Sequence, residues 1–156
     1  MSIIIRAYVD TDWPALSRIH DAARLDELAS IRVDAFRTLE QTYEAEGLFD
    51  GEVWVGELDG EVAGFIAFSD DEVTWTYVHP TFYRRGVGRA LLRHVLYRAT
   101  ALVELTVLDG NTAAHRLYES EGFVLQETRV GKLAGNESFA ATGHIMSFTP
   151  PRVSLL

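Results

Sequence analysis

The chain has 156 residues, of which 47% are hydrophobic and 24% charged, proportions typical of one soluble globular domain. Its net charge of −9 argues against a general affinity for nucleic acid or for an anionic membrane surface. The absence of cysteine excludes disulfides, thiolate zinc sites and a cysteine nucleophile. The N-terminal apolar run is too short for a signal peptide and no run approaches a membrane span, so we expect a cytoplasmic protein with no membrane partner.

The first third of the chain predicts one strand and two helices. Residues 3–8 are mostly apolar and suit a strand. Pro14 fits the first turn of a helix that runs to about residue 24. A second helix is predicted over residues 30–46, and Gly47 ends it.

Three strands follow, joined by tight turns. β-Branched and aromatic residues predict strands at 53–58, 62–68 and 73–78. Asp59-Gly60 between the first two is a strong hairpin signal. The run 69–71 supplies a second turn.

The loop after residue 78 predicts an anion site. Pro80 ends strand pairing, and Gly86 and Gly88 let the backbone turn sharply before apolar residues recur at helical spacing from Val87 to about residue 100. The neighbouring basic residues are Arg84, Arg85 and Arg89. A helix start has unpaired N–H groups, and with two glycines and positive charge beside it we expect it to bind a phosphate or pyrophosphate.

The last third predicts a strand, a helix and a closing strand pair. Residues 102–108 are reached by a helical crossover, so this strand should run parallel to 73–78. Asn111 caps a helix that ends near Gly122. Residues 123–130 and 140–148 form an antiparallel pair, and their connection, 131–138, is a candidate mobile flap.

The order β-α-α-β-β-β-α-β-α-β-β describes an α/β (α+β) fold, in which a mixed, mostly antiparallel central sheet is flanked by helices. We expect one domain over residues 1–150 and a C-terminal tail over 151–156. The apolar end of that tail, 153–156, is compatible with docking on a second copy of the chain as a homodimer.

This order and two motifs resemble the GNAT superfamily of acyl-CoA N-acyltransferases, and the similarity spans residues 3–148. The first motif is the loop Tyr83-Arg84-Arg85-Gly86-Val87-Gly88, where the family usually shows Gln/Arg-x-x-Gly-x-Gly/Ala. The second comprises Asn111, Ala113-Ala114, Tyr118 and Gly122-Phe123. One departure is clear: Tyr83 stands where the family carries Gln or Arg.

The resemblance implies a GNAT-like N-acetyltransferase domain that uses acetyl-CoA as co-substrate. In the family the loop amides cradle the pyrophosphate, and the end of the preceding strand lies along the pantetheine arm, which it can pair as another strand would. The residues implied for cofactor binding are Tyr77, Val78, His79, Arg84, Arg85, Gly86, Val87, Gly88, Arg89, Asn111 and Tyr118. A plain helix cap explains Asn111 equally well. Because Tyr83 lacks the usual side-chain chemistry, binding should depend mainly on the loop amides.

Acetyl transfer needs a neutral amine and a proton for the thiolate leaving group. Tyr118 matches the family's general acid, and a phenol with a pKa near ~10 stays protonated at neutral pH. Glu72 matches the base of the histone-acetylating members, with Glu104, His79 or an ordered water as alternatives. Thr106 occupies the position where members that acetylate ribosomal-protein N-termini carry a glutamate, which argues against that subtype. No spacing of His and carboxylates indicates a metal site.

The predicted function is transfer of an acetyl group from acetyl-CoA to a primary amine, by direct attack in a ternary complex. The acidic first half of the chain favours a small cationic acceptor. The alternatives are a protein lysine or N-terminus as acceptor, and a non-catalytic acyl-CoA-binding regulatory module on the same fold. A P-loop nucleotide hydrolase fits poorly, because no Gly-Lys-Ser/Thr follows the loop.

Overall fold

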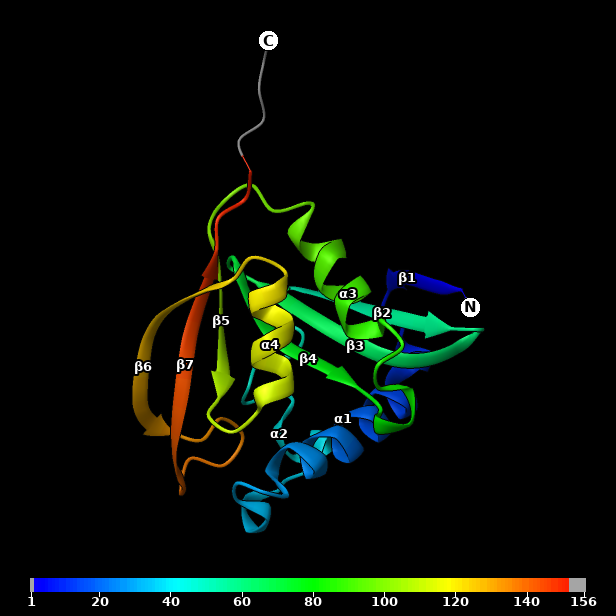
Figure 1. Cartoon of the computed structure of the whole chain (residues 1–156). Helices are drawn as coiled ribbons and strands as arrows, with labels where there is room; N and C mark the ends of the chain where they lie inside the picture. Colours follow the sequence, from blue (N-terminus) through cyan, green and yellow to red (C-terminus); the bar gives the residue numbers. More distant parts are fainter. Residues whose placement is uncertain (1, 152–156) are drawn as a thin grey trace.

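The computed structural model describes residues 2–151, which form a seven-stranded sheet with helices on both faces (Figure 1). The strands are β1 (Ile3–Ala7), β2 (Glu52–Leu58), β3 (Glu61–Ser69), β4 (Glu72–Val78), β5 (Val103–Leu108), β6 (Val124–Lys132) and β7 (Ala140–Phe148). The α-helices are α1 (Trp13–Leu28), α2 (Leu39–Thr42), α3 (Val87–Leu96) and α4 (Thr112–Ser120). Short 3-10 turns are η1 (Asp10–Asp12), η2 (Val33–Ala35) and η3 (Pro80–Phe82). The contact predicted for 153–156 lies outside the described residues.

The strands lie side by side in the order β1-β2-β3-β4-β5-β7-β6. Every neighbouring pair is antiparallel except β4 and β5, which are parallel. The predicted element order and the mixed, mostly antiparallel sheet flanked by helices are therefore confirmed. The predicted hairpin is also present, because Asp59 and Gly60 take φ angles of 52° and 84°, as a two-residue turn of this kind requires. Within residues 2–151, no helix is long and apolar enough to cross a bilayer.

Two apolar layers hold the helices on the sheet. On one face Leu16 and Ile19 of α1 pack with Phe65 and Trp75 of the sheet. On the other face the buried row of α3, which includes Leu91 and Leu92, packs with α4 and the opposite side of the same strands. Complete burial of a leucine side chain contributes about 1.5–3 kcal/mol, so these layers fix both helices against the strands that carry the site.

The predicted helix over 30–46 is wrong, because a new helix begins in the middle of it. Thr38 is extended, its Oγ1 accepts a hydrogen bond from Gln41 N (3.3 Å), and the Gln41 side chain accepts one from Thr38 N (2.9 Å). Leu39 N donates to Asp21 Oδ1 of α1 at 2.9 Å. A continuous helix would lose this capping box, so only the four-residue α2 forms. The α1 helix extends to Leu28, four residues beyond its predicted end. The α3 helix stops at Leu96, four residues before its predicted end.

The connection predicted as a mobile flap is tied to the first third of the chain. Leu133 is buried against Leu28 and Ala35, and its N–H donates to Phe139 O at 2.8 Å. Arg24 of α1 donates to Ala134 O at 2.8 Å. These contacts pack the connection between β6 and β7 against α1 and η2.

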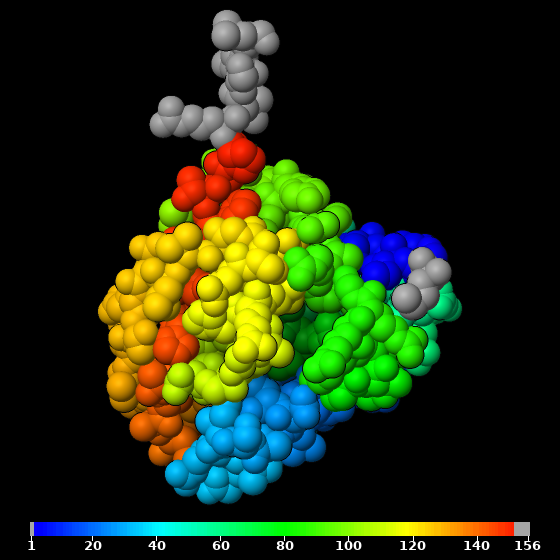
Figure 2. All heavy atoms as spheres, viewed as in Figure 1, coloured from blue at the N-terminus to red at the C-terminus, as the bar shows by residue number. Residues whose placement is uncertain are grey.

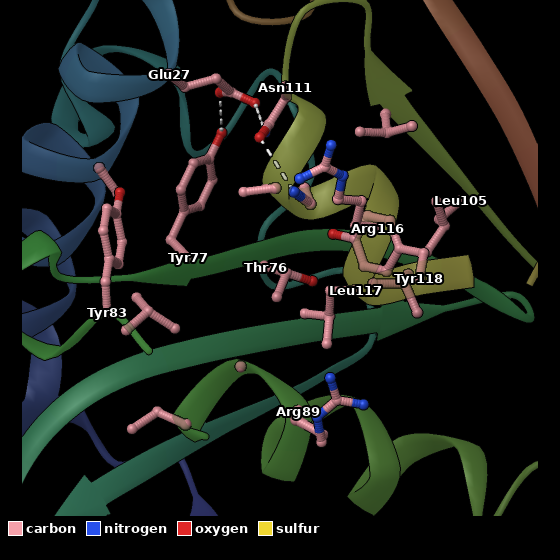
Figure 3. A pocket seen from close by; sticks show the side chains of 18 of the residues that line it. Glu27, Thr76, Tyr77, Tyr83, Arg89, Leu105, Asn111, Arg116, Leu117 and Tyr118 are labelled. Atoms are coloured by element: carbon pink, nitrogen blue, oxygen red, sulfur yellow. Dashed lines mark hydrogen bonds between the residues drawn. The ribbon is translucent and has the colours of Figure 1, made fainter. Parts of the chain in front are cut away.

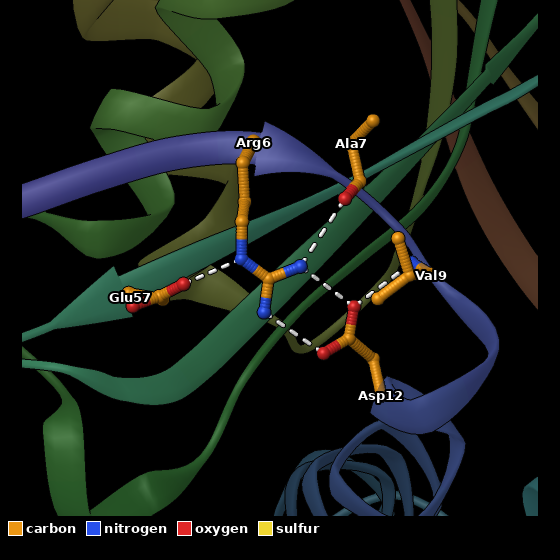
Figure 4. Close-up of polar contacts among 5 residues, drawn as sticks. All are labelled: Arg6, Ala7, Val9, Asp12 and Glu57. Atoms are coloured by element: carbon orange, nitrogen blue, oxygen red, sulfur yellow. Dashed lines mark hydrogen bonds and ion pairs between the residues drawn. The ribbon is translucent and has the colours of Figure 1, made fainter.

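An ion cluster fastens β1 to the start of α1 (Figure 4). The guanidinium of Arg6 donates two hydrogen bonds of 2.8 Å to the Asp12 carboxylate and a third to Glu57. Asp12 also accepts a bond from Val9 N at 2.9 Å and is 6% exposed. Hydrogen bonding to Arg6 holds the pKa of the Asp12 carboxyl below its usual range.

Candidate active site

The site is a cleft that opens where β4 and β5 separate. The two strands pair at a single register position, Glu72 with Glu104, at the start of β4. Beyond that pair they diverge, and a cleft of about 830 Å³ lies between their carboxyl ends. Figure 2 shows the hollow between the η3–α3 segment, α4 and α1. Its lining comes from both faces of the sheet, since α1 contributes to it as well as α3 and α4.

The start of α3 forms one end of this cleft. Gly86, the N-cap, has a left-handed φ of 86° and no side chain with which to cap the helix. The first N–H groups of α3 therefore lack intrahelical acceptors at the positive end of the helix dipole. Gly86, Val87, Gly88 and Arg89 all line the cleft, so this geometry suits a phosphate.

Arginine side chains add positive charge to the same end. Arg84 lines the cleft and has a φ of 62°, a left-handed conformation that costs a non-glycine residue about 1–2 kcal/mol. Arg89 Nη1 donates to Ser120 Oγ and pairs with Glu121, both at 3.0 Å, which joins α3 to the end of α4. Arg116 of α4 also lines the cleft, although the sequence motifs did not indicate it (Figure 3).

Tyr118 lies on α4 with its ring against Phe123 (centroids 5.8 Å apart) and lines the cleft. Burial raises the pKa of Tyr118 to about 12, and the neighbouring Thr76 hydroxyl opposes that shift only in part. The phenol is thus protonated at neutral pH and can donate a proton. Thr76 Oγ1 is enclosed and has no hydrogen-bond partner within residues 2–151, an arrangement that costs about 1–3 kcal/mol.

The α1 end of the cleft carries a polar cluster around Glu27 (Figure 3). Glu27 Oε1 accepts hydrogen bonds from Arg24 (2.6 Å) and from the Tyr77 hydroxyl (3.4 Å), and its Oε2 accepts one from Asn111 Nδ2 (2.9 Å). Asn111 Oδ1 also accepts a bond from Ala114 N at 3.4 Å, so Asn111 does cap α4. Burial, with the Glu27 charge beside it, raises the pKa of Tyr77 well above that of a free phenol.

Of the eleven residues predicted to bind the cofactor, nine line the cleft and two do not. Of the two predicted catalytic residues, Tyr118 lines the cleft and Glu72 does not. The nine that line it are Tyr77, Val78, Arg84, Gly86, Val87, Gly88, Arg89, Asn111 and Tyr118. His79 and Arg85 do not: His79 Nδ1 accepts a bond from Thr81 N (3.2 Å) and so shapes the η3 turn, while Arg85 is exposed. Glu72 is solvent-accessible at the closed end of the β4–β5 pair, where partial desolvation of its carboxyl group and the facing Glu104 raise its pKa. Neither glutamate lines the cleft.

Residues 13–123, which is most of the chain, match the Acetyltransferase (GNAT) family. The matched segment includes the loop at the start of α3, residues 83–88 (the α3 loop), and Tyr118. The chain therefore belongs to the GNAT acetyltransferase family, as the two motifs indicated.

Relatives of known name resemble parts of the chain. A peptidyl-lysine N-acetyltransferase, YiaC of Escherichia coli K12, is 34% identical over 77 residues, which is 49% of this chain and 52% of the relative. An L-methionine sulfoximine/L-methionine sulfone acetyltransferase of Salmonella typhimurium LT2 is 33% identical over 96 residues, 53% of this chain and 56% of the relative. The chain thus spans about half the length of the curated relatives it matches.

Solved structures resemble the whole fold. The ribosomal-protein-S18-alanine N-acetyltransferase of Escherichia coli has a TM-score of 0.74 at 26% identity, over 99% of this chain and 97% of that one. A putative acetyltransferase of Salmonella typhimurium, yncA, solved with acetyl-CoA, has a TM-score of 0.70 at 23% identity, over 100% and 98% of the two chains. The second likeness concerns the fold alone.

Proposed function

Because the chain belongs to the GNAT acetyltransferase family, we propose that it transfers an acetyl group from acetyl-CoA to a primary amine. The observation that carries this proposal is that one cleft joins an anion-binding helix start to a buried, protonated phenol. The amides at the start of α3 would hold the pyrophosphate, and the Tyr118 hydroxyl would donate a proton to the thioester sulfur. An acyl-CoA presents these two groups at the ends of one extended arm.

The free edge of β4 supports the same proposal. Among residues 2–151, this edge has no strand partner after Glu72, because β5 turns away from it. Unpaired backbone N–H and C=O groups along the edge suit the two amides of a pantetheine arm, as they would suit an added strand. Tyr77 and Val78 lie on this stretch and line the cleft.

The proposed chemistry is direct transfer in a ternary complex. The amine nitrogen attacks the thioester carbon, the C–N bond forms and the C–S bond breaks. Tyr118 donates its hydroxyl proton to the departing sulfur and regains a proton from solvent. Its raised pKa keeps it in the protonated form across the whole physiological range.

The proposed acceptor is a small cationic amine, because the acidic side chains that line the cleft lie at its α1 end. A protein lysine is the second candidate acceptor, and the 34% identity to a peptidyl-lysine N-acetyltransferase favours it. A non-catalytic acyl-CoA-binding module is the alternative that the test must separate from both.

The test combines calorimetry with a thiol-release assay over a panel of primary amines and a lysine-containing peptide. We expect Tyr118→Phe to bind CoA with an affinity within about twofold of the wild type, because the ring and its contact with Phe123 remain. Turnover should fall about 100-fold or more, the usual contribution of a general acid. A wild-type protein that binds CoA and acetylates no amine would identify a binding module, and full activity of Tyr118→Phe would remove the phenol from the mechanism.

A further inference from the structure

The described residues that line the cleft include only two acidic side chains, Asp26 and Glu27, in the last turn of α1. The base candidates considered from the sequence, Glu72, Glu104 and His79, are absent from that lining. A carboxylate within the cleft that binds the amine or accepts its proton must therefore come from α1.

The α1 carboxylates and Tyr118 approach β4 from opposite faces. Successive side chains of a strand alternate between the two faces of its sheet, so Thr76 and Tyr77 point in opposite directions. Figure 3 shows Tyr77 directed toward Glu27, and Thr76 directed toward Tyr118 and Leu117. A thioester that lies along β4 would meet its proton donor on one face and an incoming amine on the other.

The two carboxylates differ in their exposure and in how firmly they are oriented in the cleft. Asp26 is exposed, and its Oδ2 accepts a hydrogen bond of 3.0 Å from the Tyr83 hydroxyl, which ties α1 to the loop before α3. Glu27 has a side chain that is 14% exposed and is oriented by donors from three elements, Arg24, Tyr77 and Asn111. A carboxylate offers about four accepting positions, so Glu27 keeps one, and it is on Oε2, which has a single donor.

We propose that Glu27 is the acceptor-side catalytic residue, which binds a primary amine through Oε2. This inference rests on the proposed function. The neutral amine donates an N–H to Oε2 and attacks the thioester carbon, and its nitrogen passes one proton to Glu27 as the C–N bond forms. Glu27 then releases that proton to solvent, while the sulfur receives its proton from Tyr118, so one proton leaves nitrogen and one reaches sulfur.

The structure offers a matched pair of variants for the test. Glu27→Gln removes one charge and keeps the shape of the side chain, and Glu61→Gln makes the same change at an exposed carboxylate of β3 that does not line the cleft. Three probe amines, spermidine, L-lysine amide and L-methionine sulfoximine, are titrated by calorimetry into protein saturated with CoA, which forms a dead-end complex. Thiol release from acetyl-CoA is then followed with each amine between pH 6 and 9.

We expect Glu27→Gln to keep its CoA affinity within about twofold and to lose amine binding in the dead-end complex. Its kcat/KM for the amine should fall about 100-fold or more, and it should rise further with pH than that of the wild type, because solvent must now accept the proton. Glu61→Gln should retain amine binding and turnover within about twofold. The CoA titration of each variant also shows that the cleft is folded.

Two results would overturn the inference, and they can be told apart. If the wild type acetylates a probe amine and Glu27→Gln does so within threefold with an unchanged pH profile, Glu27 is not the acceptor-side residue and the proposed function stands. If the wild type binds CoA but neither binds nor acetylates any probe, the proposed small-amine function fails, and the inference fails with it.

Discussion

Gly88 offers the sharpest test of where the cofactor lies. It is the second residue of α3 and lines the cleft. A Cβ added there would lie 3.6 Å from Leu117 Cδ2 and 3.6 Å from Val78 Cγ2, which is ordinary van der Waals contact. Both neighbours also line the cleft, so a side chain at this position enters the cleft without clashing with the protein.

Helix propensity predicts little effect on stability. Alanine is favoured over glycine in a helix by about 1 kcal/mol and valine by a few tenths, so Gly88→Ala should stabilise the fold and Gly88→Val should be nearly neutral. The affinity for CoA, in contrast, should fall in Gly88→Val. Valine would displace a phosphate from at least one loop amide, and a hydrogen bond to a charged group contributes about 1.5–3 kcal/mol. The dissociation constant for CoA should therefore rise at least about tenfold, since each 1.4 kcal/mol is a factor of ten.

Calorimetry with CoA and urea unfolding measure the two quantities on the same samples. Gly88→Ala is the control, because its single methyl matches the Gly/Ala that the family motif accepts, and its affinity should stay within about threefold. Gly86 is the less informative glycine, since its φ of 86° makes any substitution there a stability change as well. Wild-type CoA affinity in Gly88→Val, with stability unchanged, would refute the placement of the pyrophosphate at the start of α3.

Two further predictions concern stability and pH. His20 is 3% exposed beside Trp75 and Tyr77, and burial lowers its pKa. As the pH falls, His20 is therefore protonated in the unfolded chain at a higher pH than in the folded protein. Stability should therefore fall by up to about 1.4 kcal/mol per pH unit below about pH 6.5, and urea unfolding of His20→Phe should lose that dependence; an identical pH slope in the variant would contradict this. Asp12→Asn leaves Arg6 without its bidentate partner and should cost about 2–4 kcal/mol by the same assay at pH 7. Because the folded pKa of Asp12 is lowered, its contribution is present above about pH 4 and disappears as the pH falls through the folded value, so a constant difference between the two proteins down to pH 2 would contradict the assignment.

The strands were predictable from the sequence because each carries its own evidence. The run predicted at 53–58 is the strand Glu52–Leu58, and the hairpin after it follows from Asp59-Gly60 alone. The segment around Thr38 failed because its conformation is decided by a local capping box and by a bond to Asp21 on another helix. Apolar spacing contains neither piece of information.

The lining of the cleft was predictable where a motif lies on one element. The α3 loop and Tyr118 line the cleft as the motifs indicated. Glu27 was missed because its partner Asn111 is 84 residues away and because the predicted helix stopped near residue 24. The Arg24–Glu27 pair, spaced i,i+3, was the available sign that this helix continues. Glu72 matched a family position, but strand pairing places it at the closed end of the β4–β5 gap.

The single pairing position between β4 and β5 also bears on how the fold is held together. It divides the sheet into two half-sheets, β1–β4 and β5–β7–β6, which share one point of backbone pairing. Docking of the halves therefore depends on side-chain layers, and on contacts such as Glu27 with Asn111 that bridge the gap. A ligand bound in the cleft would contact both half-sheets, so its binding would also stabilise them against separation. This stabilisation is about 2.7 kcal/mol at a ligand concentration of 100 times the Kd. Binding of such a ligand should therefore stabilise the fold as a whole, in addition to filling the cleft.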